Sequence, residues 1–300
     1  MVSSALRGAC GSERANIGVM THELIHTWGV PDLYDPGFVG KGTGHYDIMS
    51  GPYGWDGMQT HPFFMSPWSR MKSGFLEPIE IVYDGYYPIA ASAESNQVYI
   101  IRTNFPVDEH LLIENRQPLD YDAQMKGSGI LIWHIDDRTD LQNEAGYAGQ
   151  EGWPWNGKHY QVALLQADGA YDLEKGNNYG DFGDYFIEGD ELSPDGEVYP
   201  NSNAYQNGEV RSTGIRIHDI SPSSQLMHFR VSGLGARPVP PTSSPSPSES
   251  PTGFPSPSPS ASPTEFPSPS PSVSPTELPS PSPSASPTEF PSSRDRKSVV

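Results

Sequence analysis

One stretch decides both the fold and the chemistry of this chain: His22-Glu23-Leu24-Ile25-His26-Thr27-Trp28-Gly29-Val30-Pro31-Asp32. Residues four apart lie on the same face of an α-helix, so the imidazoles of His22 and His26 can both bind one metal ion. Glu23 lies roughly a quarter of a turn away on such a helix. From there it can act as a general base on a metal-bound water without being a ligand.

A sharp turn is expected directly after the two histidines. Gly29 can adopt the left-handed conformation that ends a helix, and Pro31 prevents the helix from continuing. Asp32 can therefore return a carboxylate to the metal as the third ligand. Asp35 is the alternative third ligand, but the turn geometry favours Asp32, three residues after Gly29. Three protein ligands and one open position are typical of a catalytic zinc site, so we expect bound Zn²⁺.

A second element, Tyr46-Asp47-Ile48-Met49-Ser50-Gly51, follows the zinc motif. Alone, Met49 would be interpreted as core packing. After this zinc motif, it resembles the Met-turn that forms a hydrophobic floor beneath the metal in metzincin proteases. The surrounding glycine-rich loop, residues 37–57, is expected to form one wall of a cleft. Within it, His45 could contact substrate, and Tyr53 is a candidate hydrogen-bond donor to the transition state by position.

Composition excludes several classes of protein. The formal charge is −19 and there is no basic run, which argues against nucleic acid or an anionic membrane as partner. The single cysteine, Cys10, excludes an intramolecular disulfide framework but is compatible with secretion. No segment has the length and apolarity of a transmembrane helix. An acidic surface suits a secreted hydrolase, so we expect a secreted or cell-surface protein.

The chain changes character near residue 235. Nineteen of its 32 prolines lie between Pro238 and Pro291, in a Pro/Ser/Thr segment that repeats every twelve residues. So short and polar a unit cannot bury a core. Residues 236–294 are therefore interpreted as an extended stalk, which could attach the protein to a cell surface or matrix, or alternatively as an inert disordered tail.

We expect the chain to be a fragment. The first ten residues lack the apolar region of a signal peptide, and too few residues precede the metal-binding helix for the sheet that zincins place there. Residues 295–300 break the repeat and are expected to be a non-native tail. Residues 1–235 would then be a partial catalytic domain.

The patterning predicts an α+β fold. Apolar residues at helical spacing indicate a helix around the zinc motif, with Ser12 as a candidate N-cap, and a second helix over residues 62–74. Later segments are short and β-rich. The expected strands are residues 97–102, 110–115, 129–135 and 159–166, with a closing hairpin of 214–220 and 226–231. Helices first and strands afterwards predict a helical zinc region followed by a β-rich subdomain, then the stalk.

A second type of metal site is suggested by residues 168–184, which are dense in Asp, Asn and Gly. Carboxylate oxygens on a glycine-permitted loop are what Ca²⁺ requires, although the spacing is not that of an EF-hand. The candidate calcium ligands are Asp168, Asp172, Asp181 and Asp184. The alternative is a solvated acidic loop with Asx-turns. The remaining histidines, including His134 and His159, are interpreted as packed or surface residues, and His61 has no evident role.

The chain resembles the immune-inhibitor-A-like secreted metalloproteases of the metzincin clan over residues 17–232. The matching segments are Gly18-Val19-Met20-Thr21-His22-Glu23, Asp32-Leu33-Tyr34-Asp35, Tyr46-Asp47-Ile48-Met49-Ser50-Gly51, Pro67-Trp68-Ser69, Gly74-Phe75-Leu76-Glu77-Pro78, Glu114-Asn115-Arg116-Gln117-Pro118, Gly127-Ser128-Gly129-Ile130-Leu131-Ile132-Trp133-His134 and Gln166-Ala167-Asp168-Gly169. Two departures are Leu24-Ile25 in place of an aromatic-Gly pair and Phe75 in place of Trp.

The resemblance implies a metzincin-like zinc endopeptidase that is secreted as a zymogen, cleaves extracellular protein or peptide substrates and often binds calcium. It implies His22, His26 and Asp32 as zinc ligands, Glu23 as general base and Met49 as the Met-turn. Two other interpretations stay open at this point. One is a catalytically inactive zincin-like binding or adhesion module on a stalk, and the other is a zinc hydrolase of non-peptide substrates.

Overall fold

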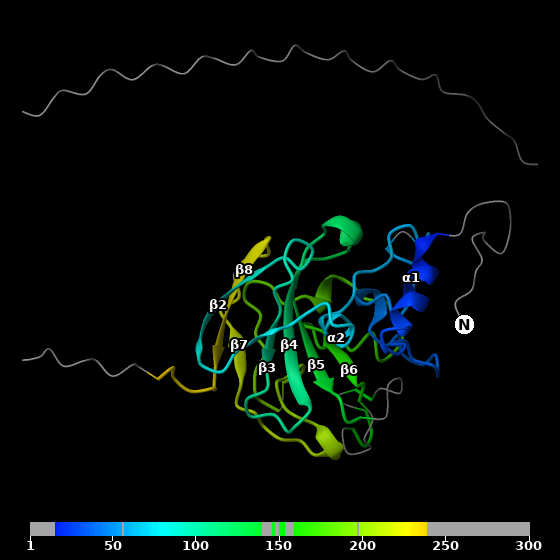
Figure 1. Ribbon diagram of the computed structural model, residues 1–300. Coiled ribbons are helices and arrows are strands. Elements are labelled where there is room, and N and C mark those ends of the chain that lie inside the picture. Colours follow the sequence, from blue (N-terminus) through cyan, green and yellow to red (C-terminus); the bar gives the residue numbers. More distant parts are fainter. Residues whose placement is uncertain are drawn as a thin grey trace, which may run out of the picture. The chain divides into compact units, whose positions relative to one another are not determined.

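The computed structural model (Figure 1) describes residues 16–55, 57–139, 146–147, 150–153, 159–196 and 198–238. Cys10, Ser12 and the stalk and tail predicted beyond residue 238 lie outside the described residues. Within the described part, the helix that carries the zinc motif begins at Ile17, with Asn16 as its N-cap.

A five-stranded sheet forms the centre of the fold. Its strands lie in the order β1-β3-β4-β5-β6, with β1 parallel to β3 and the other neighbours antiparallel. The strands are β1 (Ile79–Glu80), β3 (Tyr99–Ile101), β4 (Glu109–Arg116), β5 (Gly129–Asp136) and β6 (Val162–Leu165). β4 and β5 are buried along their whole length, because both faces of the sheet are covered.

A second, three-stranded antiparallel sheet lies in the order β2-β8-β7. Its strands are β2 (Gly85–Ala90), β7 (Arg216–His218) and β8 (Leu226–Ser232). β2 is an edge strand of this sheet, which is where a proline such as Pro88 is tolerated because it cannot donate a ladder hydrogen bond.

The two faces of the central sheet carry two separate cores. Successive side chains of a strand point to opposite faces. Accordingly, Leu112 and Trp133 pack in one cluster with the segment that contains the zinc motif. Leu111 and Ile132 pack in the other cluster, with residues of β2, β7 and β8. Figure 1 shows the blue zinc-motif segment on one side of the central sheet and β2, β7 and β8 on the other.

The helices are short. α1 (Ile17–His26) carries the two histidines of the zinc motif, and α2 (Pro67–Lys72) lies against β4. α2 begins where it does because the Ser66 side chain accepts a hydrogen bond from the Ser69 backbone and a proline occupies the first helical position. The remaining helices are single 3₁₀ turns: η1 (Gly44–Tyr46), η2 (Asp120–Asp122), η3 (Phe182–Asp184) and η4 (Gln206–Gly208).

The expectation of an α+β fold is wrong. Eight strands in two sheets dominate the described residues, whereas the two α-helices there have only ten and six residues. The zinc-motif segment is not a helical half with a core of its own, since Ile25 and Leu33 pack into the same cluster as Trp133 of β5. The fold is therefore mostly β, and the metzincin-like architecture implied by the resemblance is not found in this part of the chain.

Single elements were predicted better than their assembly. The strands predicted over residues 97–102, 110–115, 129–135 and 159–166 are confirmed as β3 to β6, and the closing hairpin is confirmed as β7 and β8. The helix predicted over residues 62–74 is too long by more than a turn, because Ser66 caps it late. Among the described residues, no helix is long and apolar enough to cross a lipid bilayer.

Candidate metal centre

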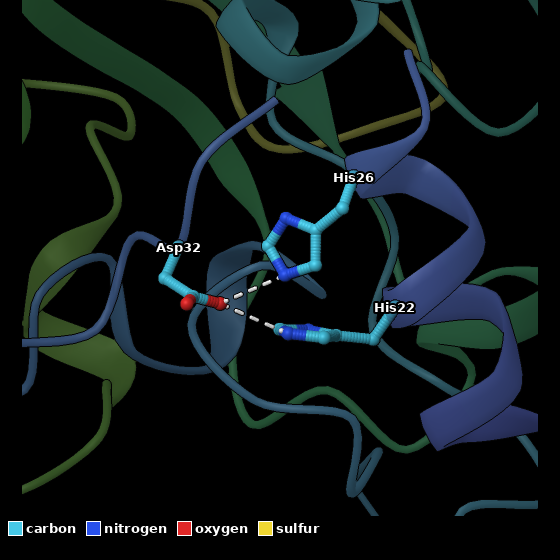
Figure 2. A group of neighbouring side chains, drawn as sticks. All are labelled: His22, His26 and Asp32. Carbon is cyan, nitrogen blue, oxygen red and sulfur yellow. Dashed lines mark ion pairs between the residues drawn. The ribbon is translucent and has the colours of Figure 1, made fainter. Parts of the chain in front are cut away.

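Helix α1 brings His22 and His26 together on one face. Their rings meet edge to face, with 4.8 Å between the ring centroids. His22 is buried and His26 is half-buried, so the pair lies at the border between the core and solvent. Figure 2 shows both rings directed from the helix toward Asp32 on the loop opposite.

The turn after α1 returns Asp32 to the two rings. Gly29 has φ = +83°, the left-handed conformation expected at the end of the helix. The Oδ1 atom of Asp32 lies 3.0 Å from Nε2 of His22 and 3.3 Å from Nε2 of His26. These three side chains form the one group of at least three His, Cys, Asp or Glu side chains within the described residues that could hold a metal ion.

Backbone carbonyls set the orientation of both rings. The Nδ1 atom of His22 lies 2.9 Å from the carbonyl oxygen of Ile48, and Nδ1 of His26 lies 2.7 Å from that of Val30. A carbonyl oxygen only accepts hydrogen bonds, so each Nδ1 carries the proton and donates. In a neutral ring, Nε2 then keeps its lone pair, which is the form that binds a metal. Both Nε2 atoms face Oδ1 of Asp32.

Asp32 uses its two oxygens differently. Oδ2 accepts a hydrogen bond of 2.9 Å from the hydroxyl of Tyr34. Oδ1 is buried and has no hydrogen-bond partner among the described residues, although two imidazole nitrogens lie close to it. Two neutral imidazole nitrogens and one carboxylate oxygen are a donor set that suits zinc. Oδ1 and the two Nε2 atoms converge closely enough to hold one metal ion, and this donor set is compatible with zinc.

Asp35, the alternative third ligand, accepts backbone hydrogen bonds with both of its carboxylate oxygens. Its Oδ1 accepts from the backbone N–H of Gly37 at 2.8 Å, and its Oδ2 accepts from that of Gly40 at 2.5 Å. Both oxygens thus hold the following loop in place. The structure separates the two candidates and brings Asp32 to the histidines.

Glu23 is half-buried and lies beside the cluster rather than in it. Together with His22 it lines a cavity of about 700 Å³, a volume within the range of ligand-binding sites. His45 and Tyr53 line the same cavity, whereas His61 lines a separate hollow with Asp120 and Tyr121.

Met49 follows Ile48, whose carbonyl contacts His22, and its role as a Met-turn beneath the metal stays a prediction. It is fully buried, and its carbonyl oxygen accepts a 2.9 Å hydrogen bond from the backbone N–H of Leu33. The preceding residue, Ile48, supplies the carbonyl that orients His22. The Tyr46–Gly51 turn thus contacts the metal centre through its backbone.

The four candidate calcium ligands do not form a metal-ion group of the kind found at His22. The carboxylates of Asp168, Asp172 and Asp181 accept hydrogen bonds within their own loop. Asp168 accepts from the backbone of Ala170, and Asp181 caps η3 by accepting from Gly183. Asn178 donates to both Asp172 and Asp181. These contacts match the Asx-turn alternative, and calcium binding stays a prediction.

Asp184 differs from the other three aspartates because it is buried. Its Oδ2 accepts from the hydroxyl of Tyr46 at 2.7 Å and from the backbone of Asp181 at 2.8 Å. Burial, with smaller contributions from the nearby carboxylates of Asp181 and Asp168, raises the pKa of Asp184 to about 6.

Three contributors to the site were missed in the sequence: the hydroxyl of Tyr34 and the carbonyls of Val30 and Ile48. Backbone carbonyls carry no side-chain signal, so no pattern could have revealed those two. Tyr34 could have been found, because a hydroxyl two residues beyond a carboxylate ligand is a candidate for supporting it.

No model of a known protein family matches the chain, and no curated protein matches it. The function must therefore be argued from the geometry of the site itself.

Proposed function

We propose that this protein is a zinc-dependent endopeptidase that hydrolyses peptide bonds in proteins, with Glu23 as general base. One observation carries the proposal. Two imidazole Nε2 atoms, on rings whose Nδ1 atoms contact backbone carbonyls, converge on Asp32 beside a cavity that Glu23 lines. The resemblance of the surrounding motifs to immune-inhibitor-A-like proteases supports the same reaction, independently of the fold.

The metal would be held by His22, His26 and Asp32. When bound, zinc supplies Lewis-acid activation of a water molecule and of the substrate carbonyl. Glu23 lies next to His22 on the helix and is neither a ligand nor hydrogen-bonded to the cluster. Its carboxylate takes the proton of the attacking water and gives it to the leaving amine. The carbonyls of Ile48 and Val30 hold the two rings, and Tyr34 holds Asp32, so that all three ligand atoms stay directed to one point.

The first test is zinc stoichiometry of the purified full chain by elemental analysis, with His26→Ala as the test variant and His61→Ala as the matched control. We expect one zinc per chain in the unmodified protein and in the control, and none in His26→Ala. Equal zinc content in all three proteins, or none in a folded unmodified protein, would contradict the metal assignment.

The second test addresses the chemistry. Glu23→Gln should retain zinc and lose roughly 10²–10⁴-fold in the rate of peptide cleavage, because the amide cannot accept a proton. Glu77→Gln, an exposed carboxylate outside the site, should change neither quantity. A Glu23→Gln protein that cleaves peptides at the unmodified rate would remove Glu23 from the mechanism.

A further inference from the structure

The cavity beside Glu23 has a strongly apolar and aromatic wall. It is lined on one side by His22 and Glu23 and on the other by residues from two loops that are far apart in the sequence. The aromatic members of the lining, apart from Tyr34, are Phe38, His45, Tyr53, Trp55, Phe63 and Tyr179. A cavity of about 700 Å³ with such a wall is large enough for a whole aromatic side chain.

His45 lies at the centre of this wall, between two aromatic rings. It stacks on Phe63, with 4.4 Å between centroids, and on Tyr179, with 5.0 Å between centroids. Trp55 meets His45 edge to face at 5.2 Å, and the Trp55 indole donates a 3.0 Å hydrogen bond to Asp122. The stacked rings and this anchored indole give the wall a fixed shape.

Few charges face the cavity. Burial, assisted by the positive charge of Lys126, lowers the pKa of His45 to about 4, so the ring is uncharged at neutral pH. Both oxygens of Asp35 are occupied by backbone N–H groups of its own loop. The ammonium of Lys41 lies over the Tyr179 ring, 4.7 Å from its centroid. Besides Glu23 at the site itself, Asp35 and Lys41 are the charged side chains of the described lining.

We propose that this cavity is a specificity pocket that accepts a large, uncharged apolar side chain, aromatic above all, of the peptide whose bond lies at Glu23. The proposal rests on the proposed function, because the pocket selects the residue beside the cleaved bond. An aromatic side chain gains by covering the apolar wall and stacking against its rings. A cationic side chain loses its hydration when it enters the apolar part of the cavity, while a small side chain leaves the wall uncovered.

The binding test uses the full chain with a chelator present, so that no hydrolysis contributes. Binding of N-acetyl-phenylalaninamide, N-acetyl-alaninamide and N-acetyl-lysinamide is measured by NMR titration. We expect the aromatic probe to bind about tenfold more tightly than either of the others. Equal binding of the three probes, or preference for the lysine probe, would overturn the proposal without the need for any variant.

Two matched tyrosine variants locate the binding. Tyr179 and Tyr86 are 49% and 52% exposed, each stacks on a histidine, and each lies under a cationic side chain. Only Tyr179 lines the cavity. Tyr179→Ala should weaken binding of the phenylalanine probe about fivefold, whereas Tyr86→Ala and Tyr179→Phe should leave it unchanged. An equal effect of the two alanine variants would place the probe elsewhere.

Cleavage of a peptide library by the zinc-loaded chain separates this proposal from the proposed function. Cleavage enriched next to Phe, Tyr, Leu or Met, with the enrichment reduced in Tyr179→Ala, supports both. Cleavage without that enrichment contradicts the pocket and leaves the peptidase intact. Tyr179-dependent probe binding without any cleavage supports the pocket and contradicts the peptidase.

Discussion

Tyr34 has the position of a supporting residue for the metal centre. Its hydroxyl donates to Oδ2 of Asp32 and so leaves Oδ1 facing the two histidines. That hydrogen bond, together with burial and the charges of Asp32 and Glu23, raises the pKa of Tyr34 above its ordinary value. The hydroxyl therefore keeps its proton at neutral pH and can go on donating to the carboxylate.

Tyr34→Phe should weaken zinc binding about 10- to 100-fold, because Asp32 is then free to rotate away from the histidines. Competition with a chromophoric zinc chelator measures the dissociation constant. Tyr53→Phe is the control, since Tyr53 lines the same cavity and has no role in holding Asp32. Identical zinc affinities for the two variants would show that Tyr34 does not position the ligand.

At the scale of single residues, spacing determined what could be predicted. His22 and His26 could be paired because four residues of helix fix their geometry, and Asp32 because a Gly and a Pro fix the turn. Asp35 could not be excluded from the sequence. Its exclusion depends on which carboxylate meets the N–H groups of Gly37 and Gly40, and that is settled only by the path of the folded loop.

At the scale of elements, Asp47 ties the Met-turn to helix α2. Its Oδ1 accepts from the backbone of Met49, and its Oδ2 accepts from the backbone of Ser66 and the hydroxyl of Ser69. The side chain is fully buried, and burial raises the pKa of Asp47 although these hydrogen bonds act in the opposite direction. One carboxylate thus connects the turn that contacts His22 to the start of helix α2.

Asp47→Asn should lower the free energy of unfolding by about 2–3 kcal/mol, because an amide NH₂ cannot accept the hydrogen bonds that Oδ2 accepts. Ser69→Ala, which removes one of those donors, should cost about 1 kcal/mol. The measurement is urea denaturation followed by circular dichroism. Ser73→Ala serves as control, because Ser73 caps the other end of α2 and its hydroxyl donates to the carbonyl of Ser69 rather than to Asp47. If Asp47→Asn lowers the free energy of unfolding no more than Ser73→Ala does, Asp47 does not stabilise the contact between the turn and α2.

Element types could be predicted where residue patterns are local. The apolar runs of β4 and β5 are typical of strands buried on both faces, and both strands were placed correctly. β2 was missed because Pro88 argues against a strand unless its edge position is known. The α+β prediction failed because chain order was taken for spatial separation, whereas the central sheet packs directly against the zinc-motif segment.

At the scale of the whole molecule, buried ionisable groups act in opposite directions on stability. Burial lowers the pKa values of His45 and His110 to about 4, so their contribution to stability is lost as pH falls from about 6.5 to 4. Burial raises the pKa values of Glu174 and Asp184 to about 7 and about 6. Those two carboxyl groups favour the folded chain more as pH falls through the same range. In mildly acidic solution, the loss of stability from the two histidines and the gain from the two carboxyl groups therefore offset each other.

Glu174→Gln should therefore change the pH dependence of stability. With a folded pKa near 7 and an ordinary value of 4.5, the folded chain holds a proton that the unfolded chain has released, so Glu174 costs stability as pH rises through this window. Glutamine removes that cost and can still accept the hydrogen bond from Gln166.

Relative to the unmodified protein, the variant should gain about 2 kcal/mol in free energy of unfolding between pH 5 and pH 8, measured by urea denaturation at each pH. Glu188→Gln, at an exposed position, should show a constant difference. If the difference in free energy of unfolding between Glu174→Gln and the unmodified protein also stays constant with pH, Glu174 is ionised in the folded chain at every pH tested. Contacts other than the one with Gln166 would then compensate for its burial.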